Sequence, residues 1–380
     1  MFLFLEKIFG GYKVMKRTLS VMLLATVIPF AFAGKVIGQI TFLTGKVTLV
    51  RNGEPLPMAQ LKIGTPIEDF DLIRTGPNGK LDLIIRTPQN QQIQLAIQSN
   101  TVFSIETNKL TANTSRTTFE MMSGTLSCKV DKLAGNEVQV KTKSAAMGVK
   151  GTNFKVSTVA SDDILVTCDE GRVLCRDEEG KEYYAEPGFA VESLSEEQQF
   201  QQIKITDGDL ETFRLKWVSQ RLNVFKANAA RVLFQFSSLF QKYYNELVTI
   251  YNELKKKRGI FDKWMDEDRH GEIAPLADLI KEKRAVAGLL LRAKGKLYMF
   301  DRIYFRILEI ESYYNEGIGR ETYRSFSPQK FFADLATKKF QIENMIYVIR
   351  YLFKLFAIRN EGYFPVDTEV GDEEYEDFFD

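Results

Sequence analysis

Histidine is almost absent from this sequence, which has a single one, His270, among 380 residues. Zinc sites built from several imidazoles and serine-type catalytic relays both depend on histidine. The composition therefore argues against both kinds of site. His270 lies in the polar stretch 266–271, where we expect it to be solvated rather than to act as an acid or base.

An excess of charge of one sign is also missing, since 51 basic and 50 acidic residues leave a formal net charge of +1. Without such an excess there is no whole-chain argument for binding nucleic acid or an anionic surface. A content of 44% hydrophobic and 27% charged residues is ordinary for a folded chain. The length predicts two or three domains.

Cysteine is scarce and odd in number: Cys128, Cys168 and Cys175. At least one thiol therefore stays unpaired within a monomer. Cys168 and Cys175 flank a predicted turn at 169–172, which would place them on neighbouring strands with an offset that seldom suits a disulfide. We expect buried thiols, with a Cys168–Cys175 disulfide or a metal or catalytic role as alternatives.

The N-terminal segment has the pattern of an export signal. Lys16 and Arg17 precede an apolar run at 19–30, and Ala31-Phe32-Ala33 supplies a small-x-small cleavage pattern before Gly34. We predict a cleaved signal peptide at 1–33, with Met15 as the true start, and a periplasmic or cell-envelope location without a membrane span after cleavage. An uncleaved anchor is the alternative.

Residues 34–192 alternate apolar and polar side chains in short runs, for example at 81–85, 93–97 and 164–168. Turn pairs such as Asn52-Gly53 and Asn78-Gly79 separate the runs at intervals typical of an all-β domain. Spacing alone leaves a sandwich, a roll and a short irregular solenoid open.

Several short motifs follow one another in this region. In Gly148-Val149-Lys150-Gly151-Thr152-Asn153-Phe154-Lys155-Val156 we expect the glycines to set a backbone bend, Thr152 to bond its local backbone and Phe154 to point into the core. This motif and four other short motifs, in the same order as in the family, give residues 36–192 a resemblance to the FecR domain family. The residues that carry the resemblance are Asp71, Thr75, Gly76, Gly124, Gly148, Gly151, Thr152, Phe154, Val156, Glu170, Gly171, Val173 and Gly188.

The resemblance implies a solenoid-like winding of short strands in which these motif residues are structural. Family members that carry a cytoplasmic anti-sigma segment, one membrane span and a receptor-contacting segment transmit signals from outer-membrane transporters to sigma factors. We expect no such cytoplasmic segment before the apolar run here, which argues against sigma-factor regulation and iron-transport signalling. The family name therefore implies a scaffold whose activity depends on what is attached to it.

Beyond residue 192 proline and glycine become sparse, which favours long helices. We predict a polar linker at 193–207 and an antiparallel three-helix bundle at 208–365 with coiled-coil-like seams. The helices should run from the N-cap Asp209 to Lys257, where Gly259 ends the first, then over 274–315, and from the N-cap Ser327 to Arg359. Their many aromatic residues favour a bundle core, and also contacts with a partner or a second copy. The acidic tail 366–380 should stay solvated. A divalent-cation site is the alternative, although the carboxylates lack the ordered spacing of a calcium loop.

No set of residues with catalytic, cofactor-binding or metal-ligating spacing emerges, since acidic pairs such as Asp162-Asp163 fall in predicted turns. The first hypothesis is a non-enzymatic envelope protein that acts through protein contacts, possible signalling included. The alternative is a structural or wall-associated module that binds glycan or assembles into an envelope complex. A hydrolase is the third hypothesis and lacks candidate residues.

Overall fold

The computed structural model describes residues 36–363, apart from 88–90, 112–113, 132–135, 144, 150, 178–179, 196–198, 206–208 and 272–274. The predicted signal peptide, the Met15 start and the acidic tail lie outside these residues. None of the helices in the described part is long and apolar enough to cross a membrane.

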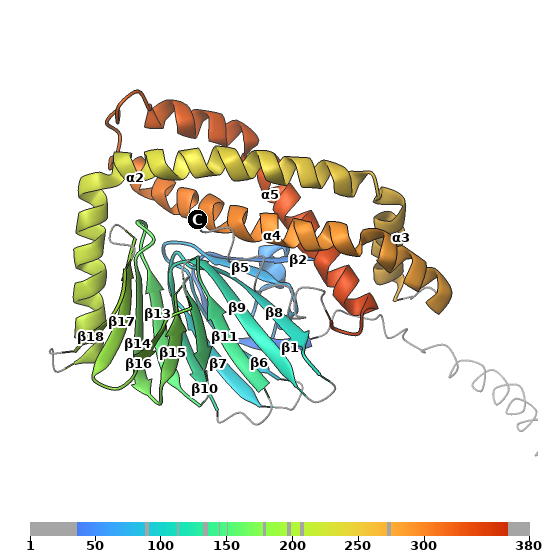
Figure 1. The fold of residues 1–380 in the computed structure, drawn as a ribbon, viewed down its shortest axis with the longest axis horizontal. Helices are drawn as coiled ribbons and strands as arrows, with labels where there is room; N and C mark the ends of the chain where they lie inside the picture. Colours follow the sequence, from blue (N-terminus) through green and yellow to red (C-terminus); the bar gives the residue numbers. More distant parts are fainter. Residues whose placement is uncertain are drawn as a thin grey trace, which may run out of the picture.

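Within the described residues the N-terminal region forms two nine-stranded open sheets (Figure 1). In spatial order, sheet A contains β18(Gln199–Lys204), β17(Phe189–Leu194), β14(Ile164–Glu170), β13(Asn153–Thr158), β10(Thr125–Val130), β7(Gln92–Ile97), β6(Lys80–Arg86), β1(Val36–Thr44) and β4(Pro66–Glu68). Sheet B contains β16(Glu182–Ala185), β15(Val173–Arg176), β12(Ala146–Val149), β11(Asn136–Lys141), β9(Ser115–Ser123), β8(Val102–Lys109), β5(Leu72–Thr75), β2(Val47–Arg51) and β3(Glu54–Pro55). A short 3-10 helix at Met58–Gln60 lies between β3 and β4 in the chain.

The two sheets pack face to face across one apolar core, as the alternating pattern requires. Leu126 of β10, for example, is fully buried and pairs with Ile97 of β7 on one side and Val156 of β13 on the other. The chain passes back and forth between the sheets as it advances from one end to the other. The prediction of an all-β domain is confirmed as two open sheets, whereas a solenoid is not.

Four helices follow in the described residues: α2(Leu210–Lys255), α3(Arg258–His270), α4(Leu276–Asn315) and α5(Pro328–Arg359). Asp209 caps α2 by accepting from the backbone N–H groups of Glu211 and Thr212, and Ser327 caps α5 in the same way. Both caps were predicted from the sequence.

The predicted three helices missed α3, and Gly259 lies inside that helix instead of ending the first one. The chain turns after Lys255, and the new helix direction buries Phe261 and Trp264 against the other helices. Gly271 then ends α3 in the left-handed conformation with φ 70°. Burial of two large aromatic side chains explains why the helix breaks without a proline.

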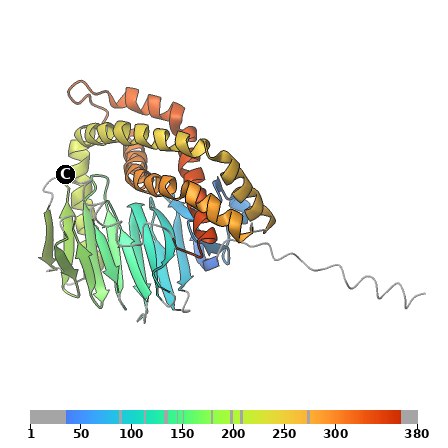
Figure 2. The ribbon, with the colours of Figure 1, turned by 45° about the vertical axis from the view of Figure 1, so that its right-hand side comes forward.

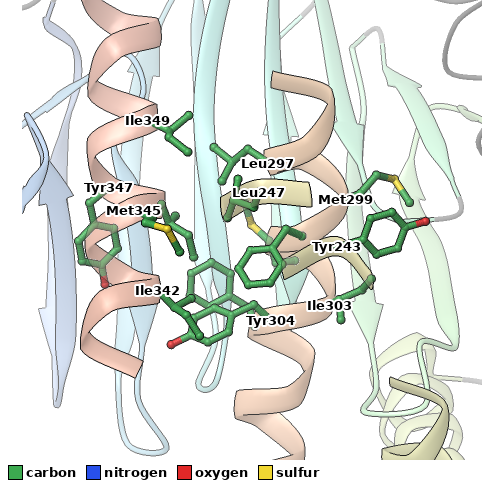
Figure 3. Packing of buried hydrophobic residues seen from close by; sticks show 14 of the residues in the cluster. Tyr243, Leu247, Leu297, Met299, Ile303, Tyr304, Ile342, Met345, Tyr347 and Ile349 are labelled. Atoms are coloured by element: carbon green, nitrogen blue, oxygen red, sulfur yellow. The ribbon is translucent and has the colours of Figure 1, made fainter. Parts of the chain in front are cut away.

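The helices do not form a separate three-helix bundle. Their core, centred on residues of α2, α4 and α5 (Figure 3), continues into Leu72, Val102 and Met122 of sheet B. The sequence neighbours Ile73 and Phe103 point into the inter-sheet core instead. Helices therefore cover the outer face of sheet B around β5, β8 and β9, and this part of the sheet shares one apolar core with the helices.

Each long helix contacts a different part of the sheets (Figures 1 and 2). The first turns of α2 lie beside sheet A, where Trp217 packs on Leu165 and Ala190. Helix α4 crosses β9, and α5 contacts β2 and β3. The helices thus hold both ends of the β region.

The stretch 193–207 is not a simple linker. Residues 199–204 form β18, which pairs along its length with β17. As an edge strand β18 exposes most of its side chains, and its glutamine-rich sequence therefore resembles a loop. Only Phe200 and Ile203 pack against neighbouring cores.

Gly151→Ala is expected to lower the free energy of unfolding by about 1 to 2 kcal/mol, because Gly151 has a φ of 62°. Gly148, which we also expected to need glycine, has no positive φ and open space around a Cβ position. Gly148→Ala is therefore the matched control and should change stability little. Because the core is shared, β and helical circular-dichroism signals should shift together in urea unfolding. Equal effects of the two substitutions would contradict this reading of Gly151.

Candidate binding groove between the sheets and the helices

The first motif residues fix the backbone at the two ends of β5, with Asp71 directly before the strand and Thr75 as its last residue. The buried carboxylate of Asp71 accepts hydrogen bonds from Arg51 Nε (2.9 Å), Arg51 Nη2 (2.5 Å) and the Glu68 N–H (2.9 Å). Burial raises the pKa of Asp71 and Arg51 opposes that shift. Thr75 Oγ1 donates to the Gln98 carbonyl (2.6 Å) and accepts from the Thr101 N–H (2.9 Å). The turn that follows Thr75 is thus tied to the loop between β7 and β8.

The remaining motif residues lie in the core or in turns. Gly124, Gly171 and Gly188 have φ angles of 97°, 88° and 91°, and the Gly76 N–H donates to the Lys46 carbonyl at 2.8 Å. Glu170 is exposed at the end of β14. The fully buried motif residues are Phe154, Val156 and Val173.

Thr152 differs from the expectation that its hydroxyl bonds the local backbone. Its Oγ1 is buried without a hydrogen-bond partner among the described residues, and its backbone carbonyl accepts from the Val130 N–H at 2.8 Å. Its methyl group lies 2.7 Å from the place where a Cβ of Gly171 would be. Close packing against Gly171 therefore fixes Thr152.

A groove of about 430 Å³ lies where the Thr75-Gly76 turn faces the helices. Val102, Phe305 and Leu308 give it an apolar floor, and charged side chains stand around it. The residues that line it come from four strands, their loops and two helices: Lys46, Thr48, Arg74, Thr75, Gly76, Pro77, Asn100, Val102, Ser123, Phe305, Leu308, Glu309, Ser312, Lys339 and Glu343. A cleft of this volume is in the usual range for ligand sites.

Arg74 is the central charged residue of the groove. Its guanidinium group pairs with Glu343 at 2.9 Å and lies over the Phe305 ring, 5.3 Å from the centroid. Burial alone would lower the pKa of Arg74, but Glu343 and Tyr347 raise it above its usual value. Arg74 is therefore held in place and stays charged.

Ion pairs with at least one buried partner join the strand region to the helices along their interface. Most place the acid on the β region and the base on a helix, so the two surfaces are electrostatically complementary. The pairs are Lys354–Glu68 (2.5 Å), Lys294–Glu106 (2.5 Å), Arg306–Asp162 (2.9 Å), Arg221–Asp163 (2.8 Å) and Arg214–Asp169 (2.7 Å). Asp162 and Asp163, predicted as turn residues, do lie in the β13–β14 turn and are bound there by helices.

Asp301 of α4 is the acid of a second buried cluster. Burial raises its pKa to about 6, although Arg350, which donates to it, and Arg302 oppose the shift. Nearby Glu120 has its pKa lowered: burial would raise it, but Arg302 and Arg350 outweigh that effect.

A pH dependence follows from Asp301. A carboxyl whose pKa is higher in the folded state binds more protons when folded, so its contribution to stability rises as the pH falls from 7 to 5. With a shift from 3.8 to about 6, the gain should be about 1 kcal/mol. Urea unfolding at both pH values in the wild type and in Asp301→Asn isolates this part. An identical pH dependence in both proteins would contradict it.

The three cysteines are free thiols and all are buried. Cys168 lies in sheet A and Cys175 in sheet B, not on neighbouring strands of one sheet. Burial raises the pKa of Cys168 to about 11 and that of Cys175 to about 12, and it raises that of Cys128 further. Thiols with such pKa values are poor nucleophiles at neutral pH.

His270 is exposed near the end of α3, and its Nδ1 lies 2.9 Å from the Asp266 carbonyl oxygen. Among the described residues there is no group of three or more histidine, cysteine, aspartate or glutamate side chains able to hold a metal ion.

Comparison with protein families identifies the strand region around this groove. Residues 71–174 match the family model described as FecR protein. The chain carries a FecR domain. The matched segment begins at Asp71, directly before β5, includes the Thr75-Gly76 turn of the groove and ends within β15. The resemblance read from the motifs is thereby confirmed for the central part of 36–192.

Solved structures with some similarity include two crystal structures, at 1.65 Å and 2.50 Å resolution, of a candidate anti-sigma factor from Parabacteroides distasonis ATCC 8503. Each is 16% identical, with a TM-score of 0.29, over 35% of this chain and 59% of that chain. The FecR-domain chain thus spans less than two thirds of those proteins, and at this TM-score we draw no conclusion from the likeness. No curated protein matched.

Proposed function

We propose that this FecR-domain protein is a non-enzymatic regulatory protein of the cell envelope that works through protein contacts, with the groove beside Thr75-Gly76 as its contact site. The groove carries this proposal. It joins the FecR motif turn to α4 and α5, so a partner bound there touches both parts of the chain at once.

The side chains of the groove suit recognition better than chemistry. Leu308 and Pro77 offer apolar area, and the paired side chains of Arg74 and Glu343 can still hydrogen-bond to a partner. Aromatic and arginine side chains supply much of the binding energy in protein interfaces. The paired charges would fix the orientation of a bound segment more than its affinity.

The proposal is tested by capture from solubilised cell envelope with the tagged protein as bait. We expect one defined protein to be retained at stoichiometric level, and no co-sedimentation of the bait with purified, protein-free wall material. Co-sedimentation with the wall, without a retained protein, would instead support the structural or glycan-binding alternative and reject the proposal.

A further inference from the structure

Residues 366–380 have a composition that complements the groove. The segment holds eight carboxylate side chains and no lysine or arginine, and aromatic residues stand among the acids. The last four residues, Asp377-Phe378-Phe379-Asp380, place two phenylalanines between two aspartates.

The groove offers matching chemistry for such a sequence. Its apolar floor is buried at Val102 and Phe305, but Leu308 there is half-buried and Pro77 beside it is exposed. Phenylalanine rings can pack on these two side chains. Lys46, which lines it, is exposed and has no ion pair among those of the described residues. Lys339 of α5 also lines it and is paired with Glu311 (3.0 Å). Phenylalanines on the floor and aspartates at these lysines would satisfy both parts of the groove.

The chain is long enough to reach it. The described chain ends at Tyr363, whose ring lies 5.8 Å from Lys109 Nζ, and the Gly362 carbonyl accepts from the Lys109 N–H at 3.1 Å. Lys109 ends β8, and Val102, at the other end of that strand, lines the groove. Eight strand residues cover about 25 Å, whereas the fourteen residues from 364 to 377 can span up to about 46 Å.

We propose that the segment 366–380 docks in this groove of its own chain, with Phe378 and Phe379 on the floor and the flanking aspartates at Lys46 and Lys339. The docked segment covers the surface that we propose as the contact site for the partner. The inference therefore rests on the proposed function. A partner must then displace the tail, which makes the tail an autoinhibitory competitor in cis at high effective concentration.

The test uses the full chain with Phe379→p-benzoylphenylalanine, a photo-cross-linking side chain, and maps the cross-links by mass spectrometry. We expect cross-links to concentrate on the peptides that contain Val102 and Leu308. Lys46→Glu should lower their yield roughly three- to fivefold, and so should a rise in salt from about 0.05 to 0.5 M. Lys204→Glu, on the exposed edge strand β18, is the matched control and should leave the yield unchanged.

The proposal would be overturned by cross-links spread over other surfaces, or by equal yields in Lys46→Glu and Lys204→Glu. It would also be overturned by cross-links between chains in a mixture of ¹⁵N-labelled and unlabelled protein, because these would mean that a second copy occupies the groove. Circular dichroism of each variant checks that the fold is kept. If the cross-linking experiment fails but a protein is captured from the envelope, only the docking of the tail is rejected. If groove cross-links form but no protein is captured, the proposed partner contact is rejected and the docking of the tail stands.

Discussion

Replacing Arg306 by Met is expected to lower the free energy of unfolding by about 3 to 5 kcal/mol. Arg306 of α4 is 1% exposed, and its guanidinium donates to Asp162 Oδ1 (3.0 Å), Thr158 Oγ1 (3.1 Å) and Glu309. Without it Asp162 keeps Lys143 at 2.8 Å, but Glu309 is left as a buried acid without its cation. Burial already raises the pKa of Glu309, against the opposing effect of Arg306.

Arg116→Met is the matched control. Arg116 pairs with Glu137 at 2.8 Å between β9 and β11, but both side chains are partly exposed, so the loss should stay below about 1 kcal/mol. Urea unfolding followed by circular dichroism and by the fluorescence of Trp217 and Trp264 measures both. Similar losses in the two variants, or separate transitions for the two tryptophans, would contradict a buried interface that unites sheets and helices.

Gly124→Ala should lower the free energy of unfolding by about 3 kcal/mol or more. Gly124 ends β9 with a φ of 97°, where a side chain costs about 1 to 2 kcal/mol. A Cβ there would also lie 2.3 Å from Thr101 Oγ1, 2.4 Å from Thr101 Cα and 2.7 Å from the Asn100 carbonyl oxygen. Overpacking against backbone adds typically 1 to 3 kcal/mol.

Gly188→Ala separates the two contributions to that loss. Gly188 has a similar φ of 91° but nothing within 4 Å of the Cβ position, so only the conformational part should remain, about 1 to 2 kcal/mol. The same unfolding measurement compares the variants. If both lost the same stability, the close approach of the 100–101 loop to Gly124 would have no energetic weight.

Much of the fold could be predicted from the sequence, because local patterns determine local structure. Alternation at Leu81, Leu83 and Ile85 reported a strand with one buried face, and Asp209 and Ser327 marked the helix starts. The pattern could not report that β8 is buried on both faces, because the covering helices lie some 200 residues further along the chain. For the same reason a shared core was read as a separate bundle.

The candidate site was only half accessible to sequence reasoning. Motif residues Thr75 and Gly76 pointed to a constrained turn, and that turn forms one wall of the groove. The other wall comes from Phe305 and Glu343, whose helical spacing gave no sign of a cavity. Likewise, the sequence identified Asp162 as a turn residue but could not show that it binds Arg306, which lies 144 positions further along the chain.

The central claim, that the groove is the contact site for a protein partner, is tested most directly by filling it. Ser312 lines the groove from α4, and its hydroxyl donates to the Glu309 carbonyl. Ser238 on α2 is an exposed serine with the same kind of bond, to Phe234. With the captured partner in a binding titration, Ser312→Trp should weaken affinity at least tenfold and Ser238→Trp should leave it unchanged. Equal affinity of the two folded variants for the partner would contradict the account.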